Sequence, residues 1–140
     1  MSKVRNFIRL IVISIHHFIL KRLYRMDISK TARISFGTKL DKTNPKGIHI
    51  CDESYFASGA IMFSHDFSRG VKTNTYVGKR CFIGANSIIM AGVKVGDEVI
   101  VGSGAIVTKD IPSNSIVVGN PARIIKTGIR TSKFGQLVNN

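Results

Sequence analysis

The sequence predicts an all-β solenoid, a parallel β-helix of about four coils preceded by an α-helix. An aliphatic residue returns at every sixth position from Val77 to Val107, and glycine follows four of these residues. A small or β-branched residue comes four positions after each aliphatic, and residues i and i+4 share one face of an extended strand. A fixed short period is typical of a solenoid. An α-helix would not repeat every six residues, and each glycine would cost it about 1 kcal/mol.

The first expected element is a helix over residues 1–26 that is both apolar and basic. Its apolar residues form two stripes at helical spacing, and its basic residues lie near the two ends: Lys3, Arg5, Arg9, Lys21, Arg22 and Arg25. Arg9, Ser14 and two histidines interrupt the apolar run, which falls short of the roughly 18 apolar residues of a membrane span. Two alternatives remain open. The helix packs in a subunit interface or over the open end of the coils, or it lies on an anionic membrane surface.

The coils are expected over residues 27–112, with two interruptions. The inward-facing positions are Ile28, Ile34, Leu40, Ile50, Phe56, Met62, Val77, Ile83, Ile89, Val95, Val101 and Val107. The phase breaks first in "DKTNPKG", where Pro45 and Gly47 indicate a turn. It breaks again in "FSHDFSRGVKTNTY", which predicts a loop at residues 66–75 that leaves the β-helix. An ordinary β-sandwich is the alternative fold, but it gives no reason for a strict period of six.

Composition limits the partners and the compartment. The chain has 140 residues, enough for one domain, and a formal net charge of +13, which favours an anionic partner. Aromatic residues are few and no nucleic-acid module is visible, so a membrane surface or a phosphorylated cofactor is preferred to nucleic acid. Cys51 and Cys81 fall in the coil register and are expected to be small wall or core residues of a reduced compartment. No secretory signal is visible, which predicts a cytoplasmic location.

His65 is the candidate catalytic residue. It lies in the second break of the repeat, and loops on a rigid scaffold often carry chemistry. An imidazole titrates near neutral pH and suits a general base. Asp66 is adjacent, but neighbours on an extended chain point to opposite faces, so Asp66 need not orient it. His16 and His17 are expected to pack, and His49 to lie exposed near a corner. A zinc site of three histidines is excluded, because the coil region holds only His49 and His65.

Four motifs together resemble the hexapeptide-repeat acyltransferases: "SHDF", "IGANSIIMAGVKVGD", "VGSGAIVTKDIP" and "GNPARIIK". The resemblance covers about residues 28–127 and is nearest to the maltose/galactoside acetyltransferase and polysaccharide O-acetyltransferase branch. It implies a left-handed β-helix that assembles as a homotrimer and holds acetyl-CoA between neighbouring subunits. It also implies that His65 takes a proton from an acceptor hydroxyl, whose oxygen then attacks the thioester directly. No metal is implied.

The resemblance further implies a set of cofactor-binding residues: Gly84, Ala85, Ser103, Thr108, Lys109, Arg123 and Lys126. Backbone N–H groups near Gly84 and Ala85 would stabilise the oxyanion. Ala85 and Ser103 match positions beside the pantetheine arm, and Thr108 and Lys109 match a threonine–lysine pair of the family. Arg123 and Lys126 match basic positions that meet the nucleotide phosphates, so residues 113–140 are expected to form a tail that contacts the cofactor.

The acceptor is less clearly indicated than the donor. Where the sugar acetyltransferases carry an acceptor-binding asparagine, "ISFGTK" offers only Ser35 and Thr38. Arg69 and Lys72 of the predicted loop favour an anionic or lipid-linked sugar. The sequence therefore predicts an acetyl-CoA-dependent O-acetyltransferase of surface polysaccharide synthesis, cytoplasmic and able to touch the inner membrane. The alternatives are N-acetylation of an amino sugar nucleotide and a non-catalytic β-helix that binds anionic surfaces.

Overall fold

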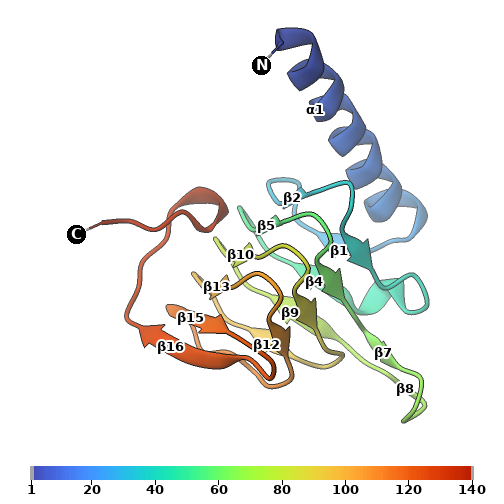
Figure 1. Ribbon diagram of the computed structural model, residues 1–140. Coiled ribbons are helices and arrows are strands. Elements are labelled where there is room, and N and C mark those ends of the chain that lie inside the picture. Colours follow the sequence, from blue (N-terminus) through green and yellow to red (C-terminus); the bar gives the residue numbers. More distant parts are fainter. Residues whose placement is uncertain (1, 140) are drawn as a thin grey trace.

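The computed structural model describes residues 2–139, which form a three-sided β-helix with one long helix at its N-terminal end (Figure 1). The helix α1 spans Lys3–Phe18 and continues through a π-helical turn at Ile19–Leu23. No helix among the described residues is long and apolar enough to cross a membrane. The helix predicted over residues 1–26 is thus present, apart from Met1, which lies outside the described residues.

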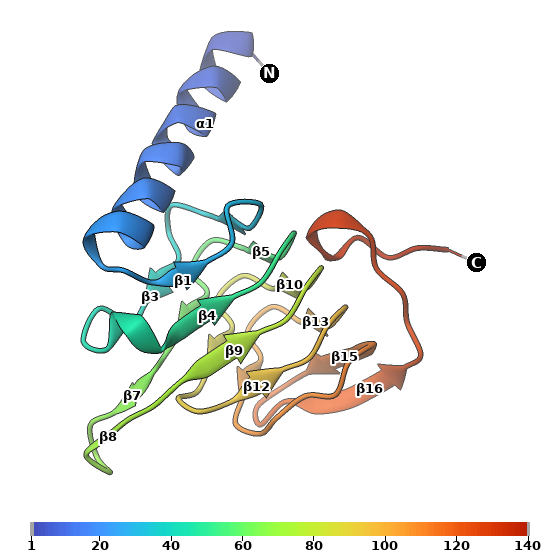
Figure 2. The same ribbon diagram turned by 180° about the vertical axis from the view of Figure 1, so that it is seen from behind.

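Three parallel sheets make the walls of the β-helix. The first contains β1 (Asp27–Ile28), β4 (Ile48–Ile50), β9 (Thr75–Val77) and β12 (Lys94–Val95). The second contains β2 (Arg33–Ile34), β5 (Tyr55–Phe56), β10 (Phe82–Ile83), β13 (Ile100–Val101) and β15 (Ser115–Val118). The third contains β3 (Lys39–Leu40), β6 (Ile61–Met62), β11 (Ile88–Ile89) and β14 (Ile106–Val107). Each coil takes one strand from each sheet, and Figure 2 shows the first wall with its four strands stacked. The predicted stack of about four coils is confirmed.

The period of six is the period of the core. Every predicted inward residue is buried, and so are the residues four positions later wherever the repeat is unbroken, including Cys81 and Val99. The strand register places equivalent inward residues of neighbouring coils directly on one another. Ile34 is paired with Phe56, and Phe56 is paired with Ile83. Phe56 is the largest fully buried side chain. The interior is therefore a continuous apolar column running through the coils.

The glycines that follow the inward aliphatics are required by crowding. A Cβ on Gly84 would lie 2.6 Å from the Val101 carbonyl oxygen, and one on Gly96 would lie 2.6 Å from the Ser113 nitrogen. Real Cβ atoms do not approach backbone so closely. Glycine at a corner can be required by a close approach of backbone or by an unusual φ. Close approach is the reason at these repeat positions.

Both breaks in the repeat fall at the same corner, where the third sheet passes to the first. The first break holds a short 3-10 turn at Pro45–Gly47, and the second holds a hairpin of β7 (His65–Asp66) and β8 (Val71–Lys72). The hairpin projects from the body of the β-helix (Figures 1 and 2). We call this the loop corner, made of residues 41–47, 63–74, 90–92 and 108–110. The corner between the second and third sheets, residues 35–38, 57–60, 84–87 and 102–105, is the second corner.

The C-terminal residues differ from the predicted tail. Strand β15 continues the second sheet beyond residue 112, and β16 (Arg123–Thr127) pairs with it in antiparallel fashion. The chain then runs back along the coils: the Thr131 hydroxyl donates to the Arg80 carbonyl over 2.7 Å, and the Phe134 N–H donates to the Glu53 carbonyl over 2.8 Å. These hydrogen bonds fix the segment against the β-helix, so residues 113–139 pack on the coils, and the cofactor contacts expected of the C-terminal tail stay a prediction.

Candidate active site

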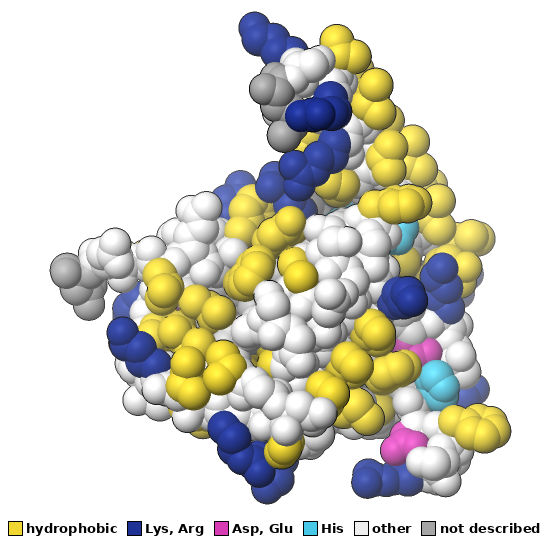
Figure 3. All heavy atoms as spheres, viewed as in Figure 1, with side chains coloured by type: hydrophobic (Ala, Val, Ile, Leu, Met, Phe, Trp, Pro, Cys, Tyr) yellow, Lys and Arg dark blue, Asp and Glu magenta, His cyan; other side chains and the backbone are white. Residues whose placement is uncertain are grey.

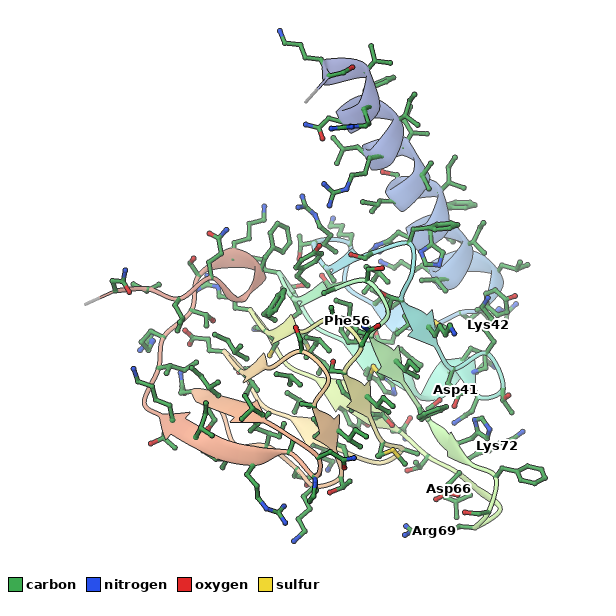
Figure 4. The ribbon with its side chains drawn as sticks, viewed as in Figure 1. Asp41, Lys42, Phe56, Asp66, Arg69 and Lys72 are labelled. Carbon is green, nitrogen blue, oxygen red and sulfur yellow. The ribbon has the colours of Figure 1, made fainter. Side chains whose placement is uncertain are left out.

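His65 meets Asp41 at the loop corner. Asp41 follows β3 and His65 follows β6, and these strands are neighbours in the third sheet with Leu40 opposite Met62. Stacking one coil on the next therefore brings together residues that lie 24 positions apart. The Nδ1 atom of His65 is hydrogen-bonded to the Oδ2 atom of Asp41. Figure 4 shows Asp41 at the base of the hairpin and Asp66 and Arg69 farther out on it.

Backbone donors hold the Asp41 carboxylate in place. Its Oδ2 accepts the N–H groups of Ser64 and His65 over 2.9 and 3.0 Å, and its Oδ1 accepts the Thr43 N–H over 2.9 Å. Burial alone would raise the pKa of Asp41, but the hydrogen bonds from Ser64, from the His65 ring and from Thr43 and Asn44 hold its pKa below the usual value. Asp41 is thus an ionised, nearly inaccessible acceptor, with 2% of its side chain exposed.

This arrangement fixes the tautomer of the neutral His65 ring. An ionised carboxylate can only accept hydrogen bonds, so Nδ1 of His65 must carry the hydrogen that faces Asp41. In the neutral ring the unprotonated nitrogen is then Nε2. The ring is 24% exposed and packs edge-on against Phe63, with 6.3 Å between ring centroids. His65 is therefore an oriented imidazole with an available basic nitrogen.

The base of the hairpin is held by Asn44. Its Nδ2 donates to the Ser64 carbonyl over 2.8 Å and to the Thr73 carbonyl over 2.9 Å, so one side chain joins the two ends of the insertion. The Thr73 N–H donates in turn to the Ser64 carbonyl over 2.9 Å. The first break in the repeat thus supplies the side chain that holds the hairpin of the second break, and both breaks lie at one corner.

A crevice of about 470 Å³ opens beside His65. It is lined by Phe63, His65, Asp66, Phe67, Ser68, Arg69, Met90, Ala91 and Thr108. A larger hollow of about 580 Å³ lies between α1 and the first coil, but the residues that line it include no carboxylate and so no acid–base pair. The crevice at the loop corner combines a histidine that is oriented by a carboxylate with space for a substrate.

Two other candidate groups in the coils, His49 and Cys81, are occupied or inert. Both ring nitrogens of His49 have partners, Asp27 at 2.8 Å and Asn74 at 2.8 Å, and the ring stacks on Tyr76. His49 is thus half-buried within β4, not exposed as predicted. Burial raises the pKa of the Cys81 thiol to about 12. Within residues 2–139, no three His, Cys, Asp or Glu side chains gather as a metal site.

The predicted cofactor residues lie at separate places in one chain. Thr108 lines the crevice with His65, and Lys109 follows it at the loop corner. Gly84, Ala85 and Ser103 stack at the second corner, where the Gly104 N–H donates to the Ala85 carbonyl over 2.9 Å. Arg123 and Lys126 are exposed on β16. The Gly84 N–H already donates to the Val101 carbonyl over 2.9 Å, so this N–H itself is not free for an oxyanion.

Sequence reasoning missed Asp41 and Asn44. Both lie in "DKTNPKG", which breaks the repeat just as the histidine segment does. Two breaks that are separated by one coil fall at the same corner of the β-helix. The spacing of the breaks could therefore have predicted that Asp41 lies near His65. Ser35 and Thr38, the residues considered for the acceptor, instead lie at the second corner and bond to Tyr55 and to the Ala57 carbonyl.

We expect Asp41→Asn to lower kcat by a factor of about 10² with little change in KM, because the neutral amide no longer fixes the His65 tautomer. Turnover of purified variants, corrected for the folded fraction by circular dichroism, measures this. Asp27→Asn is the matched control, since it alters the other Asp–His pair on the outside of the first coil. Equal losses in the two variants would contradict a specific role for Asp41.

Comparison with known proteins adds independent information. Residues 75–109 match the family described as the hexapeptide repeat of succinyl-transferase. The chain is 28% identical over 132 residues to the putative acetyltransferase YvoF of Bacillus subtilis (strain 168), a match that covers 89% of this chain and 77% of YvoF. It is 35% identical over 90 residues to the bifunctional protein GlmU of Fervidobacterium nodosum, which covers 64% of this chain but only 20% of GlmU.

A solved structure shares most of the architecture. The maltose O-acetyltransferase of Clostridium difficile 630 superposes with a TM-score of 0.60 at 26% sequence identity. The match covers 79% of this chain and 73% of that protein. The shared region is therefore most of both chains.

Proposed function

We propose that this chain, which is similar to hexapeptide-repeat acetyltransferases, transfers an acetyl group from acetyl-CoA to a saccharide hydroxyl. One observation carries the proposal: His65 lines a crevice and is held through Nδ1 by an ionised Asp41, which leaves Nε2 as the base. A hydroxyl is a weak nucleophile until a positioned base removes its proton. We place the reaction in the synthesis of a bacterial surface polysaccharide, in the cytoplasm.

His65 acts as the base and then as the acid. Its Nε2 takes the proton of the acceptor hydroxyl while the hydroxyl oxygen bonds to the thioester carbonyl carbon. As the carbon–sulfur bond breaks, His65 returns the proton to the leaving sulfur, so the ring ends neutral and the acetyl group has moved. The Asp41 carboxylate stabilises the imidazolium formed between these steps. No covalent enzyme intermediate is needed, in keeping with the inert Cys81 thiol.

The acyl donor is a substrate whose binding residues come from two corners. Ala85 and Ser103 are small residues that leave room for an extended pantetheine arm along the second corner. Lys109, Arg123 and Lys126 offer positive charge for the phosphates. Because Ala85 and Ser103 lie at a different corner of the protomer from His65, we propose a homotrimer in which the second corner of one protomer faces the loop corner of the next. A monomeric mass in solution would contradict this arrangement.

The crevice suits the apolar face of a sugar ring. Phe63, Phe67, Met90 and Ala91 supply apolar surface beside His65, and carbohydrate C–H groups pack against such surfaces. Arg69 stands at the rim, 82% exposed and 3.4 Å from the Asp66 carboxylate. This cation can also meet an anionic group on the acceptor, such as a uronic acid or a phosphate.

The test is thiol release from acetyl-CoA against a panel of acceptors. We expect release with neutral and anionic saccharides that offer only hydroxyl groups, and an acetyl ester in the product by mass spectrometry. Treatment with mild base distinguishes the products, because it cleaves an ester and spares an amide. Acetylation of amino sugar nucleotides alone, giving a base-stable product, would overturn the proposal and make the chain an N-acetyltransferase.

A further inference from the structure

Helix α1 presents an apolar face that points away from the β-helix (Figure 3). We call it the outer face; it comprises Val4, Phe7, Ile8, Ile11, Ile15 and Ile19, which are 38–65% exposed. These residues recur at intervals of three and four, the spacing of a single helical stripe. The segment that continues α1 meets the body through Leu20, 2% exposed, on the opposite side. The outer face is thus a continuous apolar surface in solvent.

The inner side of the helix already has its partner. His16 packs edge-on against Phe36 of the first coil, with 5.6 Å between ring centroids. Arg9 and Ile13 border the hollow that also contains Ser35 and Tyr55. Only the base of the helix is fixed to the coils, and its N-terminal turns extend beyond them (Figure 1). The outer face therefore has no packing partner among residues 2–139.

The charges around the outer face favour an anionic partner. Residues 1–26 contain six basic residues and no acidic residue. Lys3 and Arg5 lie in the first turns of α1, where the helix dipole favours negative charge. An anionic surface at this end would offset both the side-chain charges and the dipole. Pairing with the same helix of a second copy would instead bring like charges together.

We propose that α1 lies flat in the headgroup region of an anionic membrane, with its outer face in the acyl boundary and its basic residues among the phosphates. An amphipathic helix with a wide apolar stripe and basic flanks has the chemistry for this site. The inference concerns binding alone and does not rest on the proposed acetyl transfer. Vesicle binding can therefore be absent while acetyl transfer is retained, and acetyl transfer can be absent while vesicle binding is retained.

A single tryptophan tests the proposal directly, because the chain contains none. Phe7→Trp, in the full chain, places a fluorophore on the outer face. We expect its emission to shift to shorter wavelength with vesicles of phosphatidylcholine and phosphatidylglycerol, and binding at least about tenfold weaker to phosphatidylcholine alone. Phe67→Trp is the matched control at the hairpin tip, 93% exposed, and should not shift. Shifts at both positions, or at neither, would overturn the proposal.

Charge placed on the outer face gives a second test. In the Phe7→Trp chain, Ile8→Asp with Ile15→Asp should weaken vesicle binding at least about tenfold. Val138→Asp, a half-exposed apolar residue near the C-terminus, is the control and should leave binding unchanged. Light scattering on the same samples distinguishes the rival occupant. If the two aspartates reduce the oligomer mass and vesicle binding is absent in every variant, the outer face joins copies of this chain and the membrane proposal is wrong.

Discussion

His65→Ala is expected to lower kcat/KM by about 10²- to 10⁴-fold, the usual contribution of a positioned general base. The alanine removes the imidazole that Asp41 orients in the crevice. The strand pairing of the neighbouring coils should be retained. Thiol release from acetyl-CoA, with the best acceptor of the panel, measures the loss. Residual turnover from binding and positioning alone should remain.

His49→Ala is the matched control for this prediction. His49 also pairs with an aspartate, but its second nitrogen is bonded to Asn74 and cannot accept a proton from a substrate. We expect this variant to lose some stability and to keep its turnover per folded molecule. If His65→Ala retains full turnover, or if both variants lose activity alike, His65 is not the general base.

Phe56→Ala is expected to destabilise the fold by about 3–5 kcal/mol. Phe56 is fully buried at the middle of the column, between Ile34 of the coil before and Ile83 of the coil after, and removing its ring leaves a cavity that short strands cannot close. Because whole domains are stable by only about 5–15 kcal/mol, much of the variant should be unfolded at modest urea concentrations. Urea denaturation followed by circular dichroism gives the free energy of unfolding.

Phe67→Ala provides the comparison at the opposite extreme of burial. Phe67 is 93% exposed at the tip of the hairpin, so the same chemical change there should alter the free energy of unfolding by no more than about 0.5 kcal/mol. A loss below about 1 kcal/mol for Phe56→Ala would contradict its place in the core. The two variants therefore separate the effect of burial on the free energy of unfolding from the effect of the residue type.

Much of the fold and the protein class could be predicted from the sequence. The period of six identified the inward residues one by one, because in a solenoid each side chain packs only on its own coil and the two beside it. The resemblance to hexapeptide-repeat acyltransferases is confirmed by the relatives, and the fold is a left-handed parallel β-helix. The cofactor residues, the trimer and the saccharide acceptor stay predictions.

The sequence by itself determined the column of buried residues, the glycines at crowded corners and the position of His65 outside the repeat, since each follows from a strictly local period. Only the tertiary structure decided that Asp41 orients His65, that Asn44 holds the hairpin, that the Gly84 N–H is occupied and that residues 113–139 fold back on the coils. Those features join residues from different coils through hydrogen bonds at irregular segments. A repeat gives the register of its strands, but where it breaks it no longer says which side chains will meet.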